Sequence, residues 1–129
     1  MPPAKQAVVS PQAPAAIGPY SQAIALDQWV FCSGQLGLDP VSGQMVSGGV
    51  AAETRRALEN LKAVLSAAGS SPDRVVRTSV YLVDLGEFQT MNAIYAEYFP
   101  TCPPARSTIQ VAALPRGGRV EIDAIASCG

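Results

Sequence analysis

The stretch that decides the fold is VAAETRRALENLKAVLSAAGSSPDRVVRTSVYLVD, residues 50–84. Its first part, Val50–Ala68, repeats apolar residues at three- and four-residue spacing, which is typical of a helix with one buried face. Gly69 follows at the position where glycine commonly ends a helix. Val75–Asp84 then alternates apolar and polar residues, as a strand with one buried face does. A helix followed closely by a strand predicts a domain in which both kinds of element share one core.

Further strands and a second helix flank this unit. The second helix is predicted over Glu87–Phe99, because Asp84 and Glu87 have the spacing of a capping box and Pro100 stops the helix. The strands expected outside residues 50–84 are Gln22–Leu26 and Trp29–Gly34 (a hairpin that turns at Asp27-Gln28), Arg106–Leu114, Val120–Ser127 and a short edge strand at Gln6–Val9.

The predicted order is ββ, α, β, α, ββ, an α+β fold in which residues 1–129 form a single domain. Two helices on one face of a mixed sheet leave the other face to solvent or to another chain. Charged residues make up 15% of the sequence, against ~25% in ordinary soluble domains. A surface with so little charge indicates contact with a partner, and we expect an oligomer.

The composition excludes several kinds of chemistry. The chain has no histidine, which removes the commonest general base and most zinc sites. Cys32, Cys102 and Cys128 are scattered thiols, which predicts no disulfide framework, no metal site and a cytoplasmic location, with the mitochondrion as the alternative. The net charge of -1, without a basic stripe, argues against a nucleic-acid partner. No apolar run approaches the ~20 residues of a membrane span, so we expect no membrane partner.

Arg106 and Glu121 form the leading candidate pair. In the strand that starts at Arg106, Ile109 and Val111 suit the helix side, which places Arg106 on the opposite face. In the last strand Ile122 suits the helix side, which places Glu121 opposite. We therefore expect both side chains on the uncovered face of adjacent strands. An arginine fork can bind a carboxylate and a glutamate can activate water, while a cross-strand ion pair is the structural alternative.

Three further positions have a functional and a structural interpretation. Gly34 ends an apolar strand after Ser33, where it either lets a ligand approach the backbone N–H or forms a bulge. Tyr20 lies in a turn and either faces a ligand or covers the core. Asn92 interrupts the apolar stripe of the second helix, and its amide reaches either a ligand or a neighbouring group on the helix surface.

Several short motifs occur between about Pro14 and Ala126, which is nearly the whole chain. They are Gly18-Pro19-Tyr20-Ser21-Gln22, Ser33-Gly34-Gln35, Ala57-Leu58-Glu59-Asn60-Leu61, Asn92–Phe99, Pro104-Ala105-Arg106-Ser107 and Val120-Glu121-Ile122. In this order and at this spacing they resemble the RidA (YjgF) family of reactive-intermediate deaminases. Leu38-Asp39-Pro40 and Ser47-Gly48-Gly49-Val50 resemble the animal-type branch of that family.

The resemblance implies a chorismate-mutase-like α+β fold that assembles as a homotrimer, with clefts between the subunits. Family members hydrolyse 2-iminobutanoate and 2-iminopropanoate, the imine and enamine products of pyridoxal-phosphate dehydratases, to 2-oxo acids and ammonia. They use no cofactor and no metal. An electrophilic imine carbon needs only an anchored carboxylate, a placed water and a proton route to the leaving amine.

The resemblance also implies a role for each matching residue. Arg106 would bind the substrate carboxylate and Glu121 would position the attacking water. Thr108 stands where many bacterial members carry cysteine, which leaves the substrate preference open. The remaining cleft residues would be Tyr20, Ser33 and Asn92 as lining, Gly34 through its backbone N–H, and Phe88 as an apolar wall.

Two other functions compete with the deaminase. One is a trimeric small-carboxylate-binding or chaperone-like protein without turnover, which would keep Arg106 but has no need of a water-activating Glu121. The other is an endoribonuclease, an activity associated with the animal-type branch. The absence of histidine and of a basic stripe argues against RNA cleavage. The sequence therefore favours the deaminase.

Overall fold

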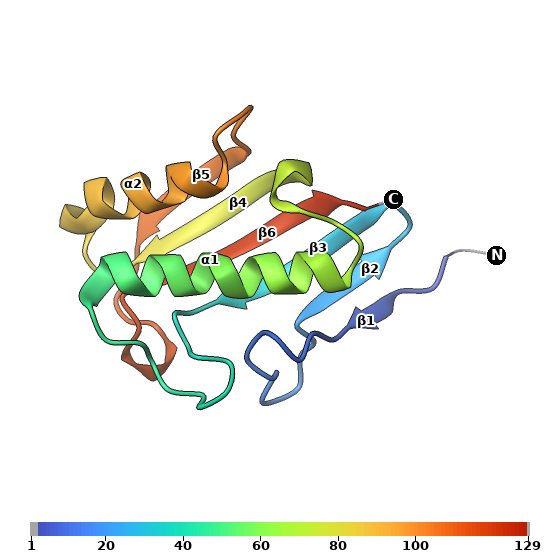
Figure 1. The fold of residues 1–129 in the computed structure, drawn as a ribbon, viewed down its shortest axis with the longest axis horizontal. Coiled ribbons are helices and arrows are strands. Elements are labelled where there is room, and N and C mark those ends of the chain that lie inside the picture. Colours follow the sequence, from blue (N-terminus) through green and yellow to red (C-terminus); the bar gives the residue numbers. More distant parts are fainter. Residues whose placement is uncertain (1–2, 129) are drawn as a thin grey trace.

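Six strands form one mixed sheet in the computed structural model, which describes residues 3–128 (Figure 1). The order across the sheet is β1-β2-β3-β6-β4-β5. All neighbours are antiparallel except β4 and β5, which run parallel. The strand bounds are β1 Gln6–Val8, β2 Ala23–Leu26, β3 Trp29–Gln35, β4 Val75–Leu82, β5 Ala105–Gln110 and β6 Val120–Ser127.

Both α-helices of the described chain, α1 Gly49–Ala67 and α2 Phe88–Tyr98, lie on the same face of this sheet (Figure 1). α1 crosses in front of the central strands, and α2 covers β4 and β5. Short 3-10 turns at Pro72–Arg74, Leu85–Glu87 and Pro115–Gly117 connect the elements. The predicted α+β class, with two helices on one face of a mixed sheet, is confirmed.

Glycines set both ends of α1, as its sequence predicts. Gly48 and Gly49 enter the helix with φ of 117° and 74°, backbone angles that side chains rarely tolerate. At the other end Gly69, with φ of 77°, donates its N–H to Ser66, and Ser70 donates to Leu65. This pair of bonds is a Schellman motif, which satisfies the last carbonyls of the helix.

The core lies between the helices and the centre of the sheet. β6 alternates strictly between buried and half-buried residues, so one set of its side chains faces α1. Burying a Leu, Ile or Val side chain stabilises a fold by about 1.5–3 kcal/mol each. The buried residues that meet here are Val120, Ile122, Ala124 and Ala126 from β6 and Leu58, Leu61, Val64 and Leu65 from α1.

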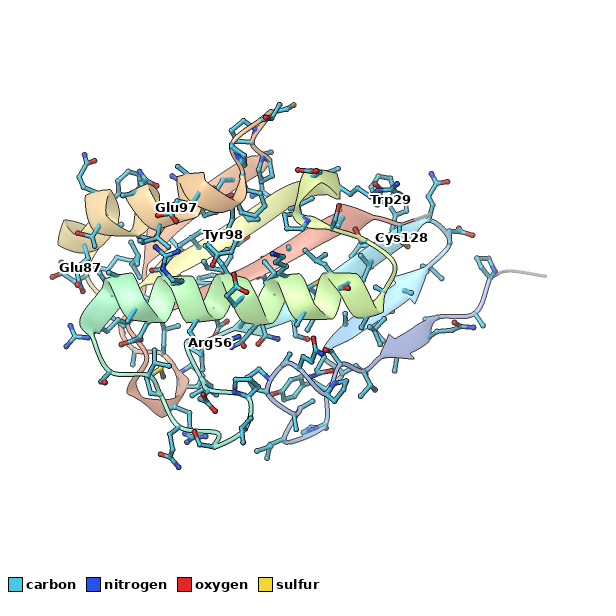
Figure 2. The ribbon with its side chains drawn as sticks, in the orientation of Figure 1. Trp29, Arg56, Glu87, Glu97, Tyr98 and Cys128 are labelled. Atoms are coloured by element: carbon cyan, nitrogen blue, oxygen red, sulfur yellow. The ribbon has the colours of Figure 1, made fainter. Side chains whose placement is uncertain are left out.

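Polar contacts hold α2 against α1 on the outer side of the helix layer. Arg55 of α1 donates two parallel hydrogen bonds to Glu97 of α2, at 3.0 and 3.1 Å. The Tyr98 hydroxyl donates to Glu59 at 2.6 Å. Figure 2 shows Glu97 and Tyr98 directed toward α1. The position of α2 is therefore fixed from both of its neighbours, the sheet and the longer helix.

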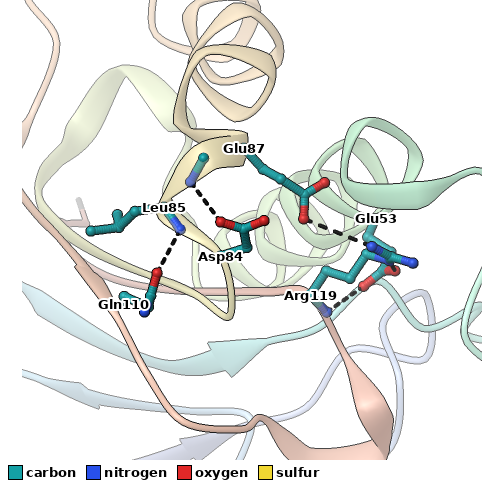
Figure 3. Close-up of polar contacts among 7 residues, drawn as sticks. Glu53, Asp84, Leu85, Glu87, Gln110 and Arg119 are labelled. Carbon is teal, nitrogen blue, oxygen red and sulfur yellow. Dashed lines mark hydrogen bonds and ion pairs between the residues drawn. The ribbon is translucent and has the colours of Figure 1, made fainter.

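The predicted capping box at the start of the second helix is wrong. Asp84 instead accepts a bond from the Gly86 N–H at 2.8 Å and caps the 3-10 turn Leu85–Glu87, which precedes α2 (Figure 3). This extra turn places the Glu87 side chain 3.8 Å from the Arg119 guanidinium. The helix accordingly starts one residue later than expected.

The predicted continuation of β5 to Leu114 is also wrong. Val111 donates its N–H to Leu82 at 2.9 Å, and beyond it the chain leaves the sheet toward the turn at Pro115–Gly117. The hairpin with Asp27 and Gln28 at its turn and the edge strand β1 form as expected.

The second face of the sheet carries no helix in the part of the chain that the structure describes. Phe31 and Ile109 lie on it with exposed fractions of 42% and 49%, beside Tyr81 and Ile125. Glu121 and Asp123 project onto the same face, because they alternate with the buried residues of β6. The predicted uncovered face is therefore present, and it mixes apolar with acidic groups.

Asn60 ties α1 to the loop that follows β3. Its side chain is fully buried and donates to the carbonyls of Leu36 and Leu38 at 3.1 and 2.9 Å. Its Oδ1 accepts from Arg56 at 3.1 Å. The amide therefore satisfies two carbonyls that the loop itself leaves unpaired.

We expect Asn60→Ala to lower the free energy of unfolding by about 2–4 kcal/mol, because two buried carbonyls lose their donor. Urea denaturation at a fixed chain concentration measures this change. Lys62→Ala, on the exposed side of the same helix, is the control and should shift the free energy by less than about 0.5 kcal/mol. Equal effects of the two substitutions would contradict the assigned role of Asn60.

Candidate active site

The structure does not bring Arg106 and Glu121 together within one chain. β4 lies between β5 and β6, so the strands that carry the two residues are not adjacent. Arg106 is in register with Thr78, which is buried under α2, whereas Glu121 is in register with Tyr81 on the uncovered face. The prediction that both share one face of adjacent strands is therefore wrong.

The error arises from the parity assigned to β5. Ile109 was expected under the helices because it is apolar, yet it is 49% exposed on the uncovered face. Its neighbour Thr108 takes the helix side together with Arg106, in register with buried Val80. β5 is an edge strand, where hydrophobicity does not identify the face that meets this chain's own core. The candidate residues accordingly form two groups on opposite faces.

The first group, here called the carboxylate half-site, consists of Tyr20, Ser33, Gly34 and Glu121. All four line a cavity of about 580 Å³ at the end of the central strands. The pairing of β3 with β6 is irregular between Cys32 and Gln35, and this bulge brings Gly34 against Glu121. The other lining residues are Ala15, Ile17, Leu36, Leu38, Pro115 and Arg116.

Gly34 is needed because the Glu121 side chain occupies the space beside it. A Cβ at position 34 would lie 2.7 Å from Glu121 Cδ and 2.9 Å from Cγ. Real Cβ atoms essentially never approach so closely, so any side chain at position 34 would displace the carboxylate. The glycine therefore lets the carboxylate lie directly against the backbone at the wall of the cavity.

Ser33 shapes the wall of this half-site through the turn that carries Tyr20. Its hydroxyl donates to the Ser21 carbonyl at 2.6 Å, and its N–H donates to Gln22 at 2.9 Å. The Tyr20 ring is 54% exposed beside the cavity. Because the Ser33 hydroxyl donates its proton to the Ser21 carbonyl, its oxygen lone pairs can accept a hydrogen bond from a ligand.

Glu121 has the electrostatic character of a general base. Burial raises the pKa of its carboxyl above the ordinary value of 4.5, and the negative charge of Asp123 raises it further. Asp123 is itself held by the Ser79 N–H and the Tyr81 hydroxyl, both at 3.1 Å. Within residues 3–128, no arginine or lysine forms an ion pair with Glu121. A carboxylate with a raised pKa accepts a proton from water more readily.

The second group, here called the arginine half-site, consists of Phe88, Asn92, Tyr95, Arg106 and Thr108. The Arg106 guanidinium carbon lies 4.7 Å from the centre of the Tyr95 ring and 5.5 Å from that of Phe88. None of the described carboxylates lies within ion-pair distance of Arg106. Asn92 Oδ1 and Thr108 Oγ1 are buried without a hydrogen-bond partner, which is an unusual state for polar atoms inside a protein.

Tyr95 is not among the site residues expected from the sequence, because it has the pattern of an ordinary core residue on the apolar stripe of the second helix. Its helical spacing from Phe88 and Asn92, at seven and three residues, was the available signal, because residues at such spacings share a helix face. The contacts that connect the two half-sites are likewise not predicted by the sequence, because they involve groups distant from both in the chain.

A buried acidic group links the elements that carry the half-sites. Glu53 of α1 is almost fully buried and accepts the Arg119 N–H at 2.8 Å. The Arg119 side chain lies 3.6 Å from Glu53 and 3.8 Å from Glu87 (Figure 3). Arg119 precedes Glu121 by two residues, and Glu87 directly precedes Phe88. The network therefore joins the start of β6 to the start of α2.

Residues 3–128 contain no cluster of three His, Cys, Asp or Glu side chains arranged to hold a metal ion. Burial raises the pKa of the Cys32 thiol to about 12, which keeps it protonated and unreactive. Among the helices of the described chain, none has the length and apolar character needed to cross a membrane.

Comparison with known proteins identifies the family. The family model described as endoribonuclease L-PSP, which covers the RidA proteins, matches residues 10–128. The chain belongs to the RidA family. The resemblance found in the sequence motifs is thereby confirmed.

Relatives in the RidA family match nearly the whole chain. A Mus musculus protein named 2-iminobutanoate/2-iminopropanoate deaminase is 54% identical over 125 residues, covering 97% of this chain and 93% of the relative. Protein DfrA of Myxococcus xanthus is 54% identical over 125 residues, covering 95% of each chain. The crystal structure of E. coli TdcF with bound serine is 38% identical, with a TM-score of 0.92, and covers 96% of this chain and 98% of that one.

We expect a carbon-13 NMR titration to give a Glu121 pKa above 4.5, the ordinary value. In Asp123→Asn the pKa of Glu121 should fall, because the neighbouring negative charge that opposes ionisation is removed. Glu97→Gln, far from the half-site, should leave it unchanged. A Glu121 pKa that does not respond to Asp123→Asn would contradict the electrostatic coupling.

Proposed function

We propose that this chain is a 2-iminobutanoate/2-iminopropanoate deaminase that converts 2-imino acids and water to 2-oxo acids and ammonia. The observation that carries the proposal is the half-buried guanidinium of Arg106, which has no acidic partner among the described residues. An unpaired arginine fork is suited to a substrate carboxylate. The named deaminases of the family support this choice, since the mouse relative is 54% identical to this chain.

The proposed reaction needs three functions from the protein. The Arg106 fork holds the substrate carboxylate and so places the imine carbon. Glu121 takes a proton from a water molecule as its oxygen bonds to that carbon, which gives a tetrahedral carbinolamine. Starting from the protonated imine, Glu121 returns this proton to the nitrogen and takes the proton of the new hydroxyl group as the C–N bond breaks, so that ammonia leaves and the C=O double bond of the 2-oxo acid forms. The proton that Glu121 then holds passes to ammonia or to solvent. Atoms and charge balance without a metal, a redox partner or a covalent intermediate.

The placement of the two half-sites supports assembly as a homotrimer with the active sites between subunits. Because Arg106 and Glu121 face opposite sides of the sheet, a small substrate needs the arginine half-site of one copy and the carboxylate half-site of another. The uncovered face offers apolar surface for such a contact, including Phe31, Ile109 and Ile125. A chain with 15% charged residues is suited to burying that face.

We also propose that the protein works in a reducing compartment, the cytoplasm or the mitochondrion. Its three cysteines are free, and Cys32 is buried among apolar residues. Such thiols persist where glutathione keeps proteins reduced.

A coupled assay tests the reaction. A threonine dehydratase generates 2-iminobutanoate, and the rate of 2-oxobutanoate formation is followed with and without this protein. We expect Glu121→Gln to lower kcat by about 10²–10⁴-fold with little change in the affinity for 2-oxobutanoate, because it removes the base and keeps the shape. Arg106→Lys should weaken 2-oxobutanoate binding instead, because it keeps the charge and loses the fork.

Lys62→Ala is a matched control, because Lys62 is exposed on the outer side of α1, and this variant should behave as wild type. Binding of 2-oxobutanoate without any acceleration of imine hydrolysis would replace the deaminase with a carboxylate-binding protein. An Arg106→Lys variant with wild-type affinity would remove Arg106 as the anchor.

Mixing two inactive variants tests whether the site is shared between chains. Arg106→Ala and Glu121→Gln chains, unfolded together at equal amounts and refolded, should regain about a quarter of wild-type activity. This fraction follows because an intact Arg106 and an intact Glu121 meet at one site in four by chance. Each variant refolded alone should remain inactive, and sedimentation should give the mass of three chains. No recovery in a confirmed trimer would place both residues in the site of one chain.

A further inference from the structure

Arg106 raises a structural question that the proposed function does not answer. An arginine that binds a carboxylate must hold its fork in a fixed plane, and proteins commonly fix it with an acidic side chain. None of the described acidic residues pairs with Arg106. The groups that do contact the guanidinium are two aromatic rings of α2, which lie one on each side of the Asn92 position along one helix face.

Tyr95 is the more firmly held of the two rings. It is 5% exposed, and its hydroxyl lies 2.7 Å from the fully buried Thr78 Oγ1. Its ring centre is 4.6 Å from that of Phe99. Thr78 is also the residue in register with Arg106 in the parallel β4–β5 pair. One buried threonine thus fixes the ring directly beside the strand position from which the guanidinium extends.

We propose that Tyr95 is a positioning residue, whose ring sets the plane of the Arg106 guanidinium for a carboxylate ligand. The inference rests on the proposed function, in which Arg106 is the anchor. A cation above an aromatic face is attracted by the negative charge density of the ring. The guanidinium carbon lies 4.7 Å from the centre of this ring, so a buried ring limits the positions that the fork can take.

The chemistry of an aromatic support differs from that of an acidic one. A carboxylate beside Arg106 would neutralise its charge and compete with the substrate for the same N–H donors. A neutral aromatic side chain orients the cation without neutralising it, so the full positive charge remains available. Burial raises the pKa of the Tyr95 hydroxyl, so the phenol stays neutral near pH 7 and adds no competing negative charge.

Phe88 contributes less to this support. Its ring is farther from the guanidinium, at 5.5 Å against 4.7 Å, and it is only partly buried. As a phenylalanine it has no hydroxyl that could anchor it to the sheet. Phe88 therefore completes the aromatic surface, while Tyr95 fixes its position.

Three substitutions at position 95 separate the ring from the hydroxyl. Tyr95→Phe, Tyr95→Leu and Tyr95→Met all lose the bond to Thr78, and only Tyr95→Phe keeps a ring under Arg106. We expect the leucine and methionine variants to weaken 2-oxobutanoate binding about tenfold, and the phenylalanine variant to stay within about threefold of wild type. The KM for the imine should rise in parallel, with kcat changed less. Thermal unfolding of each variant, with the ligand absent, confirms that folded protein is compared.

The Arg106→Gln background shows whether Tyr95 acts through the arginine. We expect Tyr95→Leu to change 2-oxobutanoate binding by less than about twofold in this background, because no cation remains to be oriented. Equal affinities of the phenylalanine and leucine variants, or the same tenfold loss in the Arg106→Gln background, would overturn the inference. If Arg106→Gln alone binds 2-oxobutanoate as wild type does, the proposed anchor fails instead, and the two failures are thus distinguished.

Discussion

The strict alternation of β6 between sheet core and open face is the constraint on which the candidate site depends. Val120 and Ile122 are buried under α1, so the side chain of Glu121, which lies between them in the strand, projects from the opposite face of the sheet. β6 is also the central strand, with β3 on one side and β4 on the other. Its neighbour β3 therefore brings Gly34 beside Glu121, and Asp123 lies two residues further along β6 on the same face. The buried residues of β6 thus determine which groups surround the Glu121 carboxylate.

The sequence was sufficient for the parts of the fold that repeat a simple pattern. The first helix, the hairpin and the last strand each follow a clear hydrophobic period, and Gly69 marks the end of the first helix. The family motifs are distinctive short sequences in a fixed order. The parity of β5 was wrong since its apolar Ile109 does not face this chain's own core. The predicted capping box is wrong because the Asp84 carboxylate accepts a hydrogen bond from the Gly86 N–H and so caps a 3-10 turn instead of the α-helix. In both cases the local sequence is compatible with two structures, and contacts made elsewhere in the fold determine which one forms.

The candidate site shows the same division. The resemblance to the family indicated the residues of both half-sites except Tyr95, whose aromatic ring at helical spacing is indistinguishable from core packing. Arg106 and Glu121 are separated because β4 lies between their strands. The order of strands in a sheet cannot be predicted from any one segment of the sequence. Orphaned atoms such as Asn92 Oδ1 are likewise visible only once packing is known. Residue identity was thus readable from sequence, while the arrangement of the residues in space was not.

The close approach of Glu121 to Gly34 makes the residue at position 34 depend on the residue at position 121. The glutamate side chain fills the volume that a Cβ at position 34 would need, whereas a smaller residue at position 121 would meet no obstacle from the glycine. A side chain at position 34 fits only if the Glu121 carboxylate shifts or a shorter residue replaces the glutamate. A lineage that keeps the glutamate in this place must therefore keep the glycine, while one that has lost the glutamate is free to lose the glycine as well.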